Sequence, residues 1–428
     1  MSFALGVIAD DFTGACDVAA GVHSLGFSVD IAVGVPAAIA PRAIDGFGST
    51  DCVVVALKTR TAAPHEAVAD SVAAAQALQR WGATRIYQKY CSTFDSTAEG
   101  NIGPVADALL DHIGPDAVSV GTPATPAVGR TVYRGHLFVD DSLLSQSSLA
   151  HHPLTPMTDS RIVRLLAPQT RHPVALISLE TVREGAEAIN ASIRMLRTRG
   201  VRHILFDAID DSDLRAVADA VAAEQNVLTA GAAGLAVALA GRREPDSSRP
   251  DHAPVAGPGL IVSGSGSQRT RAQVAHYRGP VIRLNAGSLM THDREAVVAD
   301  AMQQAAAAWS TGAVPLVSAT ADPEQVEQVQ QRWGRAASAK AVEATLAHIA
   351  VSAVEQHGVR RILVAGGETS GAVTAALGIT TLRVRTVLDA GLAWTTGTDT
   401  ADRVLDLCLK SGNFGATDLF TSAWKEPL

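Results

Sequence analysis

Short apolar runs alternate with longer amphipathic stretches along most of this chain. The first run, residues 5–9, has the length and composition of a buried strand, and the periodic stretch at 13–24 predicts a helix. Further strands are expected at 29–33, 52–57, 85–89, 117–120, 174–178, 204–208 and 227–230, and further helices at 64–81, 104–113, 182–199 and 213–224. Repeated strand–helix alternation predicts parallel sheets covered by helices on both faces.

A change of composition near residue 241 predicts a domain boundary. Residues 241–259 are polar, rich in proline and without periodicity, which is typical of a linker. The alternation then resumes, with strands expected at 260–263, 281–284, 314–317 and 362–365, and helices at 269–277, 294–309, within 324–356 and from 370. We therefore expect an α/β fold of two domains, each a mostly parallel sheet with helices on both faces.

The expected domains are residues 1–240 and 259–428, joined by a linker at 241–258, and two domains joined in this way predict a cleft that can close. The tail from about residue 411 has no clear pattern and is expected to pack back onto the second domain. Within the first domain, residues 121–160 interrupt the alternation and contain four prolines. We expect a long ordered loop there, and loops of that length inside a compact domain are usually functional.

Composition and charge narrow the range of partners. The 428 residues are 47% hydrophobic and 18% charged, so a sizeable core is available and the chain is not disordered. The net charge of −8 argues against nucleic acid as the main partner, because binding a phosphate backbone needs a concentrated basic face. A small anionic substrate is compatible with this charge, since a few placed Arg and Lys residues suffice to bind it.

The sequence gives no indication of a membrane span, a secretion signal or a disulfide framework. The N-terminus runs directly into an apparent strand and lacks a basic region followed by a long apolar stretch. The longest uncharged window, 301–321, contains Gln, Gly and Pro, which disfavours a membrane helix. The four cysteines are far apart and form no C-x-x-C. We therefore expect a cytoplasmic protein.

Two adjacent carboxylates follow the first expected strand, in the segment Asp10-Asp11-Phe12-Thr13-Gly14. Ligands of open α/β sheets bind beyond the carboxyl ends of the strands, which is where this pair lies. One carboxylate could bind a substrate hydroxyl or act as its base, and the other could cap the following helix. A purely structural alternative is that Asp11 is only an N-cap. The spacing is not the D-x-D-x-T of haloacid-dehalogenase-type phosphatases.

Cationic residues end two more strands. Lys58-Thr59-Arg60 follows the apolar run 52–57, and Lys89 ends the run 85–89, with Ser92, Asp95 and Ser96 shortly after it. Arg and Lys at strand ends are suited to a carboxylate or phosphate, and Arg can bind such a group through two hydrogen bonds. A solvated surface role is the alternative for each of them alone. Arg130 and His136, in the long loop, are weaker candidates.

The second domain contains two glycine turns at strand-to-helix junctions, Ser263-Gly264-Ser265-Gly266-Ser267 and Gly366-Gly367-Glu368-Thr369-Ser370-Gly371. Glycines let a ligand approach the backbone, and the amides at the start of the following helix favour phosphate. Neither turn is a Walker A motif, and the first fails the dinucleotide fingerprint because Arg269 replaces its third Gly. A third candidate is 410–415. Two such turns in one domain favour a nucleotide over plain tight turns.

These motifs together resemble the four-carbon acid sugar kinase family, and the resemblance covers essentially the whole chain. The matching segments are Val7–Ala15, Ser263-Gly264-Ser265, Gly366–Gly371 and Lys410-Ser411-Gly412-Asn413-Phe414-Gly415. The resemblance implies an ATP-dependent kinase of tetronic acids, with the acid sugar bound by the N-terminal domain and the nucleotide by the C-terminal domain.

Within that family, the segments 89–101 and 135–139 look like those of the 3-oxo-tetronate 4-kinase branch. Members that act on D-threonate or D-erythronate tend to have a shorter, lysine-rich version of the first segment, from which this sequence departs at Phe94 and at Ala98-Glu99. Glu368 stands where many relatives have Asp, which leaves the backbone phosphate turn intact.

The resemblance implies an ATP site formed by Ser263, Gly366, Gly367, Glu368, Thr369 and Gly412. The acid-sugar side, which depends more on residue chemistry than on the family, is expected to contain Asp10, Arg60, Lys89 and Arg130 for binding, with Asp11 or Asp95 as general base. Asp11 is the first choice and Asp95 the second. The expected reaction is phosphorylation of the 4-hydroxyl of 3-oxo-tetronate by ATP, with Mg²⁺ bridging the ATP phosphates and its protein ligands unassigned.

Three alternatives stay open from the sequence. A D-threonate or D-erythronate 4-kinase would use the same fold and site. A nucleotide-dependent dehydrogenase would explain the glycine turns, although the missing third Gly argues against it. A non-catalytic acid-sugar sensor would bind the acid without turning over ATP. No nucleic-acid or membrane partner is expected, and a homodimer is left open.

Overall fold

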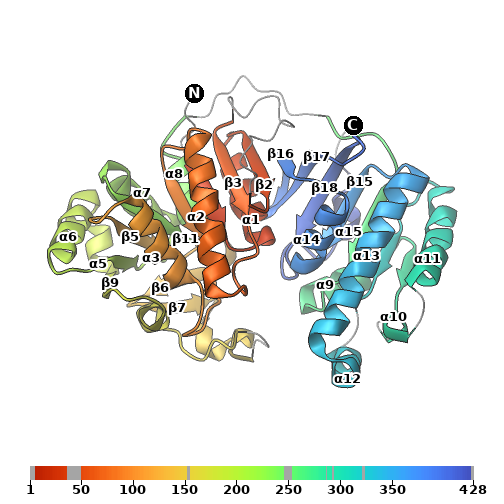
Figure 1. Cartoon of the computed structure of the whole chain (residues 1–428), viewed down its shortest axis with the longest axis horizontal. Helices are drawn as coiled ribbons and strands as arrows, with labels where there is room; N and C mark the ends of the chain where they lie inside the picture. The colour runs from red at the N-terminus through yellow and green to blue at the C-terminus, as the bar shows by residue number, and fades with distance from the viewer. Residues whose placement is uncertain are drawn as a thin grey trace. The chain divides into compact units, whose positions relative to one another are not determined.

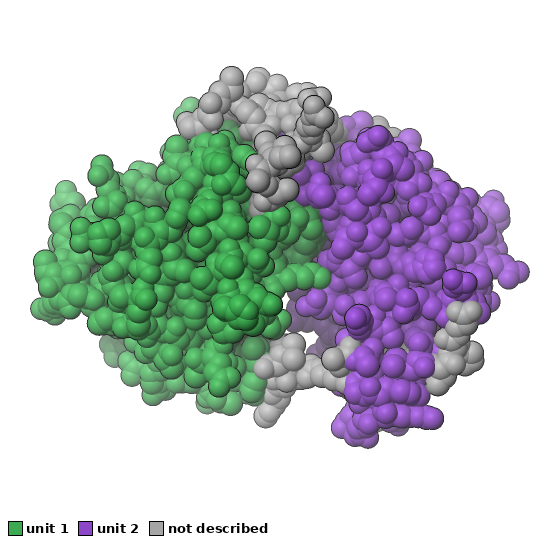
Figure 2. Space-filling model, in the orientation of Figure 1, with its two compact units in different colours: residues 1–248 green, residues 249–428 purple. Residues whose placement is uncertain are grey.

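The alternation of strands and helices builds two units, residues 1–248 and 249–428 (Figures 1 and 2). The computed structural model describes residues 5–35, 50–151, 155–244, 253–285, 287–291, 294–320 and 323–425. The division between the units falls inside the segment 241–258 that the sequence analysis assigns to a linker. Among the described residues, no helix is both long enough and apolar enough to cross a membrane.

The sheet of unit 1 is parallel at every strand pair. Its order is β2 (Val29–Val33), β3 (Cys52–Ala56), β1 (Leu5–Ala9), β4 (Ile86–Lys89), β11 (Val227–Gly231), β5 (Val118–Thr122), β10 (His203–Phe206) and β9 (Val174–Ile177). Its central strands β1 and β3 are fully buried, which explains why they read as continuous apolar runs.

Helices cover both faces of this sheet, as expected. They are α1 (Phe12–His23), α2 (Pro64–Arg80), α3 (Ile102–Ile113), α4 (Ile162–Leu166), α5 (Leu179–Arg183), α6 (Ala186–Thr198), α7 (Asp211–Ala223) and α8 (Ala233–Ala240). Helices α2 and α3 pack against each other over one face (Figure 1), and α1, α8 and α7 pack in succession on the other. Ile8 and Val55 of the sheet join Leu78 of α2 and Leu109 of α3 in one buried cluster.

Two local expectations for unit 1 are corrected. The segment expected to be one long loop contains a small antiparallel sheet of β6 (Arg130–Tyr133), β7 (His136–Val139) and β8 (Ser142–Leu143). These strands are too short to show a periodicity, and Gly135 and Asp140 make their turns at positive φ. The single helix expected at 182–199 is two, because Gly185, at φ +97°, interrupts it.

Unit 2 has a sheet of five parallel strands extended by two antiparallel ones. Its order is β13 (Val281–Arg283), β14 (Leu316–Ser318), β12 (Gly259–Ser263), β15 (Arg361–Ala365), β18 (Val404–Lys410), β17 (Leu392–Thr398) and β16 (Thr381–Asp389). The sheet is mostly parallel, as expected, but the sequence analysis did not predict β16, β17 and β18. Their polar and charged residues hide the apolar pattern.

The helices of unit 2 also lie on both faces of its sheet. They are α9 (Gln268–His276), α10 (Ser288–Thr291), α11 (Arg294–Trp309), α12 (Pro323–Trp333), α13 (Arg335–His357), α14 (Gly367–Ala376) and α15 (Leu419–Ser422). Helices α9 and α15 pack together, and their side chains join a buried cluster around Trp394. Helices α11, α13 and α14 form a second packed group (Figure 1). The tail beyond residue 411 therefore contributes to the core through α15.

Candidate functional site

The carboxyl ends of β1 and β4 lie where the strand order of unit 1 reverses. After β1 the chain moves to β2 and β3 on one side, and after β4 it moves to β5 on the other. In the register, Ala9 at the end of β1 pairs with Ala56 of β3 and Lys89 of β4. Such switch points leave a crevice that binds ligands. The segment that begins at Asp10, the segment that follows Ala56 and the end of β4 at Lys89 therefore meet at one place.

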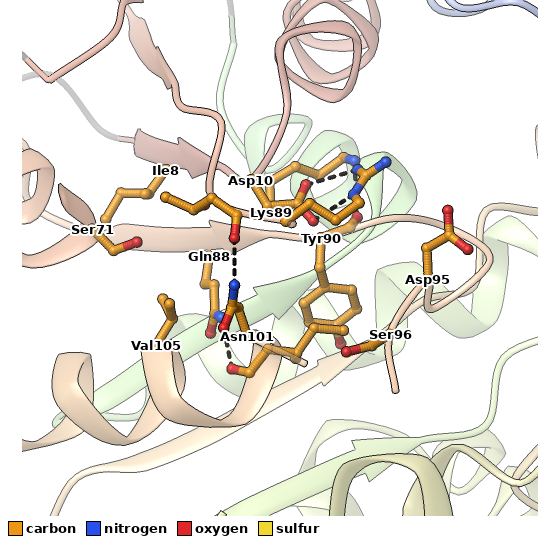
Figure 3. A pocket seen from close by; sticks show the side chains of 13 residues that line it. Ile8, Asp10, Ser71, Gln88, Lys89, Tyr90, Asp95, Ser96, Asn101 and Val105 are labelled. Carbon is orange, nitrogen blue, oxygen red and sulfur yellow. Dashed lines mark hydrogen bonds and ion pairs between the residues drawn. The ribbon is translucent and has the colours of Figure 1, made fainter. Parts of the chain in front are cut away.

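A pocket lies at this edge of the sheet and encloses about 370 Å³, part of which is open to solvent (Figure 3). Four residues that the sequence predicts for the acid-sugar side line it, namely Asp10, Arg60, Lys89 and Asp95. Asp11 contacts Arg60 but does not line the pocket, and neither does Arg130. The lining also contains polar residues that were not predicted as site residues, namely Thr59, Ser71, Gln88, Tyr90, Ser96 and Asn101.

Arg60 is held by two carboxylates. Its Nε and Nη2 donate to the two oxygens of Asp10 at 2.9 Å each, and Nη2 lies 2.7 Å from Oδ1 of Asp11. Burial works against the charge of the guanidinium, but Asp10 and Asp11 together hold the pKa of Arg60 well above its ordinary value. Arg60 thus positions the two aspartates as well as facing the pocket.

Asp11 is the N-cap of α1. Its Oδ1 accepts from the Gly14 N–H at 2.9 Å, and the Thr13 hydroxyl donates to its Oδ2 at 2.8 Å. Burial favours the neutral acid, but the neighbouring positive charges, Arg60 first, outweigh it and lower the pKa of Asp11. Both carboxylate oxygens are therefore already engaged, and the group is held as the anion.

Lys89 is the buried cation of the pocket, with 2% of the residue exposed. Its Nζ donates to the Tyr90 carbonyl at 2.9 Å, and it forms no ion pair with any described residue. A Cβ at position 14 would lie 3.0 Å from this Nζ and 2.3 Å from Asp11 Oδ1. The glycine of the Asp-Asp-Phe-Thr-Gly segment is therefore needed because Lys89 and Asp11 converge there.

Asp95 lines the pocket, whereas Arg130 does not. Thr155 Oγ1 donates to Asp95 Oδ1 at 3.0 Å, while Oδ2 accepts no hydrogen bond from the described residues. The carboxylate of Asp95 stands apart from that of Asp10 (Figure 3). Arg130 donates to the Val128 carbonyl, and its charge acts on Asp17 of α1. Burial raises the pKa of Asp17, a carboxylate that the sequence analysis did not single out.

In unit 2, three turns meet at the carboxyl ends of neighbouring strands. Ser263 of β12 pairs with Ala365 of β15, which pairs with Lys410 of β18. The following turns touch, because Gly264 N–H donates to Ala365 O at 3.0 Å and Gly366 N–H to Lys410 O at 2.9 Å. The three glycine segments that the sequence spreads over about 150 residues therefore form one surface.

Glycine is required where these turns contact each other. Gly366 has φ +126°, and a Cβ there would lie 3.3 Å from the Ser265 N. A Cβ at Gly412 would lie 2.6 Å from Ser265 Oγ, and one at Gly264 would lie 2.3 Å from Thr369 Oγ1. Side chains at these positions would separate the turns, so the residues are suited to close backbone contact.

Helix α14 begins at Gly367 without a side-chain cap, although the other turns surround its N-terminus. The first N–H groups of a helix have no partner within it, and together with the helix dipole they favour an anion. The Glu368 side chain is exposed, whereas Thr369 is buried against Gly264. Of the predicted ATP residues, the backbone of Gly367 and Glu368 thus offers donors, and Thr369 supports the turn.

Lys410 forms a hydrogen bond within the third turn and was not among the predicted site residues. It is fully buried, and its Nζ donates to Thr270 Oγ1 at 2.9 Å and to the Gly412 carbonyl at 3.1 Å. Burial, with a smaller contribution from Arg269, lowers the pKa of Lys410 to about 7. The Gly412 carbonyl also accepts from Ser267 Oγ at 2.5 Å, so its orientation is fixed.

No group of three or more His, Cys, Asp and Glu side chains within the described ranges could hold a metal ion. Of the pocket residues in unit 1 that were not predicted, one could have been recognised from the sequence. Gln88 is polar in the middle of a buried strand, Ile-Tyr-Gln-Lys, and a buried amide needs partners. Ser71 lies in an alanine-rich helix and Asn101 at a helix start, where neither residue type is unusual.

Comparison with known proteins places each unit in a described family. A family model described as a sugar-binding N-terminal domain matches residues 5–239, and one described as a nucleotide-binding C-terminal domain matches residues 260–420. A protein of Burkholderia multivorans named 3-oxo-tetronate kinase is 44% identical, over 98% of this chain and 96% of its own. A Pectobacterium atrosepticum protein of the same name is 40% identical over 99% of both chains.

The fold is also similar to a solved structure. A Salmonella typhimurium protein, described provisionally as a tRNA synthase, superposes with a TM-score of 0.85 at 36% identity, covering 98% of both chains.

Proposed function

Because this chain belongs to the four-carbon acid sugar kinase family, we propose that it is an ATP-dependent kinase that phosphorylates the 4-hydroxyl of 3-oxo-tetronate. The observation that carries the proposal is its similarity, over almost the whole length, to enzymes named 3-oxo-tetronate kinase. The phosphoryl acceptor is an alcohol, so the enzyme is a phosphotransferase. D-threonate and D-erythronate remain the alternative substrates of the same reaction.

Unit 1, with the expected bounds 1–240, binds the acid sugar in this proposal. Lys89 is the proposed partner of the substrate carboxylate, because it is a buried cation that forms no ion pair with a described residue. Arg60 contributes charge, but Asp10 and Asp11 already occupy its Nε and Nη2. Arg130 is proposed to bind the substrate less directly, because it lies beside Asp17 and does not line the pocket.

Unit 2, with the expected bounds 259–428, binds the nucleotide. We propose that the ATP phosphates contact the turns at Ser263, Gly366 and Gly412 and the first amides of α14. ATP would supply the phosphoryl group, and Mg²⁺ would neutralise the charge of its phosphates. Phosphoryl transfer depends mostly on positioning and charge neutralisation, so glycine turns and helix amides are suitable components.

A carboxylate in unit 1 accepts the proton of the 4-hydroxyl. The sequence favours Asp11, but its oxygens are bound by Gly14, Thr13 and Arg60, and a lowered pKa makes it a weaker base. We therefore place Asp95 first, because it lines the pocket and its Oδ2 is not engaged by a described residue. The expected cytoplasmic location and the homodimer remain predictions.

The test is a coupled ADP-release assay with the purified chain, ATP and Mg²⁺ across a panel of four-carbon acids that includes the 3-oxo acids. We expect the highest kcat/KM with a 3-oxo-tetronate and a 4-phosphate as product. A preference for D-threonate or D-erythronate would move the enzyme to the other branch. Binding of NAD(P)H in place of ATP would support a dehydrogenase, and acid binding without ADP release would support a sensor.

A further inference from the structure

The turn that follows β18 is closed by a hydrogen bond that does not by itself fix its central peptide. Phe414 N–H donates to the Ser411 carbonyl at 3.3 Å, so Gly412 and Asn413 are the two central residues of the turn. Turns of types I and II share this closing bond and differ by a rotation of the central peptide. The rotated form needs a positive φ at the third residue, which asparagine adopts more readily than most residues. Contacts outside the turn must therefore decide which way this peptide points.

Three side chains hold the peptide by the carbonyl oxygen of Gly412. This oxygen accepts from Ser267 Oγ at 2.5 Å, from Thr270 Oγ1 at 2.8 Å and from Lys410 Nζ at 3.1 Å. Ser267 and Thr270 belong to the start of α9, and Lys410 ends β18. Asn413 is not among the described residues with a positive φ, so the peptide is in the unrotated form. The carbonyl is thus held toward α9.

The hydrogen bonds within this group give the Thr270 hydroxyl one direction. Lys410 Nζ donates to Thr270 Oγ1 at 2.9 Å, which leaves the hydroxyl proton of Thr270 for the Gly412 carbonyl. Both side chains are fully buried, and Lys410 forms no ion pair with a described residue. A buried amine without a carboxylate partner costs free energy. Its place beneath the turn therefore indicates a role other than fold stability.

The Asn413 N–H points away from α9. In a trans peptide the carbonyl and the following N–H point in opposite directions, and the described chain has no cis peptide bond. Because the Gly412 carbonyl faces the start of α9, the Asn413 N–H faces the other way. It donates no hydrogen bond to a described residue. One of the three glycine turns therefore presents an amide donor that the fold itself does not use.

We propose, as a deepening of the proposed function and resting on it, that Lys410 and Thr270 are positioning residues for the nucleotide. They hold the Gly412–Asn413 peptide so that the Asn413 N–H donates to a phosphate of ATP. Backbone N–H groups of turns form anion-binding sites, whereas the rotated peptide would present a carbonyl oxygen that repels a phosphate. Neither Lys410 nor Thr270 touches the nucleotide in this proposal, because both lie on the carbonyl side of the peptide.

The first experiment follows the backbone amide of Asn413 by NMR in the full chain labelled with ¹⁵N-asparagine. The chain contains five asparagines, and the Asn413 signal is the one that is missing from Asn413→Gln. ATP and Mg²⁺ are added without acid sugar, so that no turnover occurs. We expect the Asn413 amide proton to move downfield, as a new hydrogen bond to a phosphate requires. An unmoved signal at an ATP concentration that saturates binding would overturn the proposal.

The second experiment measures the Kd for ATP by calorimetry in two variants of Thr270. Thr270→Val keeps the shape of the side chain and removes the hydroxyl, so the Kd should rise about three- to tenfold, the range for one neutral hydrogen bond. Thr270→Ser keeps the hydroxyl and should bind ATP as the wild type does. The Kd for the acid sugar should not change in either variant.

The matched control is Thr395→Val. The Thr395 hydroxyl is also buried in unit 2 and donates to the Leu407 carbonyl at 2.8 Å, away from the three turns. This substitution should lower the melting temperature about as much as Thr270→Val does and leave the Kd for ATP unchanged. A loss of ATP affinity in Thr395→Val equal to that in Thr270→Val would reduce the effect to stability and overturn the positioning role.

Wild-type ATP affinity in folded Thr270→Val, or equal weakening in Thr270→Ser, would also overturn the positioning role. If Thr270→Val does not fold, the Asn413 signal of the wild type and of Thr270→Ser still decides, because ATP should move it in both. Normal ATP binding and a moved Asn413 signal, without ADP release on any tetronate, would contradict the kinase function alone. No ATP binding by the wild-type chain would overturn both proposals.

Discussion

Arg60 binds Asp10 through two hydrogen bonds of 2.9 Å each, although fifty positions separate them in the sequence. The side chains are 20% and 17% exposed, and Nη2 of Arg60 also lies 2.7 Å from Asp11. Two parallel strands, β1 and β3, bring the partners together at their carboxyl ends. The ion pair holds Asp10 and Arg60 in position in the pocket lining without a bound substrate.

Arg60→Ala should destabilise the protein by about 3 kcal/mol, because it leaves two largely buried carboxylates without their cation. The measurement is the free energy of unfolding from urea titrations. The matched control is Arg164→Ala, since Arg164 binds Asp159 through two hydrogen bonds of 2.7 Å but is 63% exposed. That substitution should cost far less, because ion pairs exposed to solvent contribute little to stability. Equal costs would mean that Asp10 and Asp11 are stabilised by other groups.

Lys89→Met should raise the KM for the acid sugar roughly ten- to 150-fold, which corresponds to about 1.5–3 kcal/mol for a hydrogen bond to a charged group. The KM for ATP should change little. Met retains most of the aliphatic stem and removes the charge. Lys58→Met is the control, because Lys58 is exposed near the end of β3. If Lys89→Met leaves the KM of the acid unchanged, the carboxylate is bound elsewhere.

Gly367→Val should weaken ATP binding while leaving acid-sugar binding largely intact, because a branched side chain at the start of α14 would block approach to its first amides. The effect is read by calorimetry with ATP and separately with the acid. Ala375→Val places the same side chain at an exposed position late in the helix and controls for helix stability. Unchanged ATP affinity in folded Gly367→Val would refute the phosphate role of this turn.

Asp95→Asn should lower kcat roughly 10²–10⁴-fold, the usual contribution of a general base, with little change in stability. Asp11→Asn should keep the helix cap, since Asn caps about as well as Asp, and Asp11→Ala should lose about 1 kcal/mol of stability. Single-turnover rates and thermal melts of the three variants separate these roles.

A large loss of kcat in Asp11→Asn, with normal kcat in Asp95→Asn, would identify Asp11 as the general base, which is the first choice from the sequence. Asp17→Asn completes the series, because Asp17 is the further carboxylate near Lys89 with a raised pKa. Loss of turnover in that variant alone would assign the base to α1.

The free energy of unfolding of the wild-type chain, measured relative to that of Lys410→Met, should increase as the pH rises from about 7 to about 10. Burial lowers the pKa of Lys410 to about 7, so in this range the folded chain holds fewer protons at this site than the unfolded chain, whose lysine stays charged. Stability rises with pH wherever the unfolded state binds more protons. Below pH 7 both states are protonated and the difference should level off. A flat difference between the two unfolding curves would show that the ammonium stays charged.

The sequence determined much of the α/β architecture, because buried parallel strands and amphipathic helices have strong local patterns. The strand Val29–Val33 and the helix Arg294–Trp309 were predicted to the residue. The short strands of the proline-rich segment and the strands β16, β17 and β18 were not, because they lack a long apolar repeat. Each of them pairs with a neighbouring strand of the chain in a hairpin, but polar and charged residues within them hide the apolar pattern.

The candidate site can be divided in the same way, into features predicted from the sequence and features that only the structure shows. Strand-end charges and glycine turns predicted Asp10, Arg60, Lys89 and Gly366 as site residues from local context, since strand ends bind ligands and glycine permits close approach. Only the tertiary structure decided that Arg60 is shared between two aspartates and that Asp11 caps α1. It alone revealed that Ser71 Oγ, Gln88 Oε1, Tyr90 Oη and Asn101 Oδ1 are buried without a hydrogen-bond partner among the described residues. Whether a buried polar atom has a partner depends on packing between α2, β4 and α3, and no local sequence pattern encodes that packing.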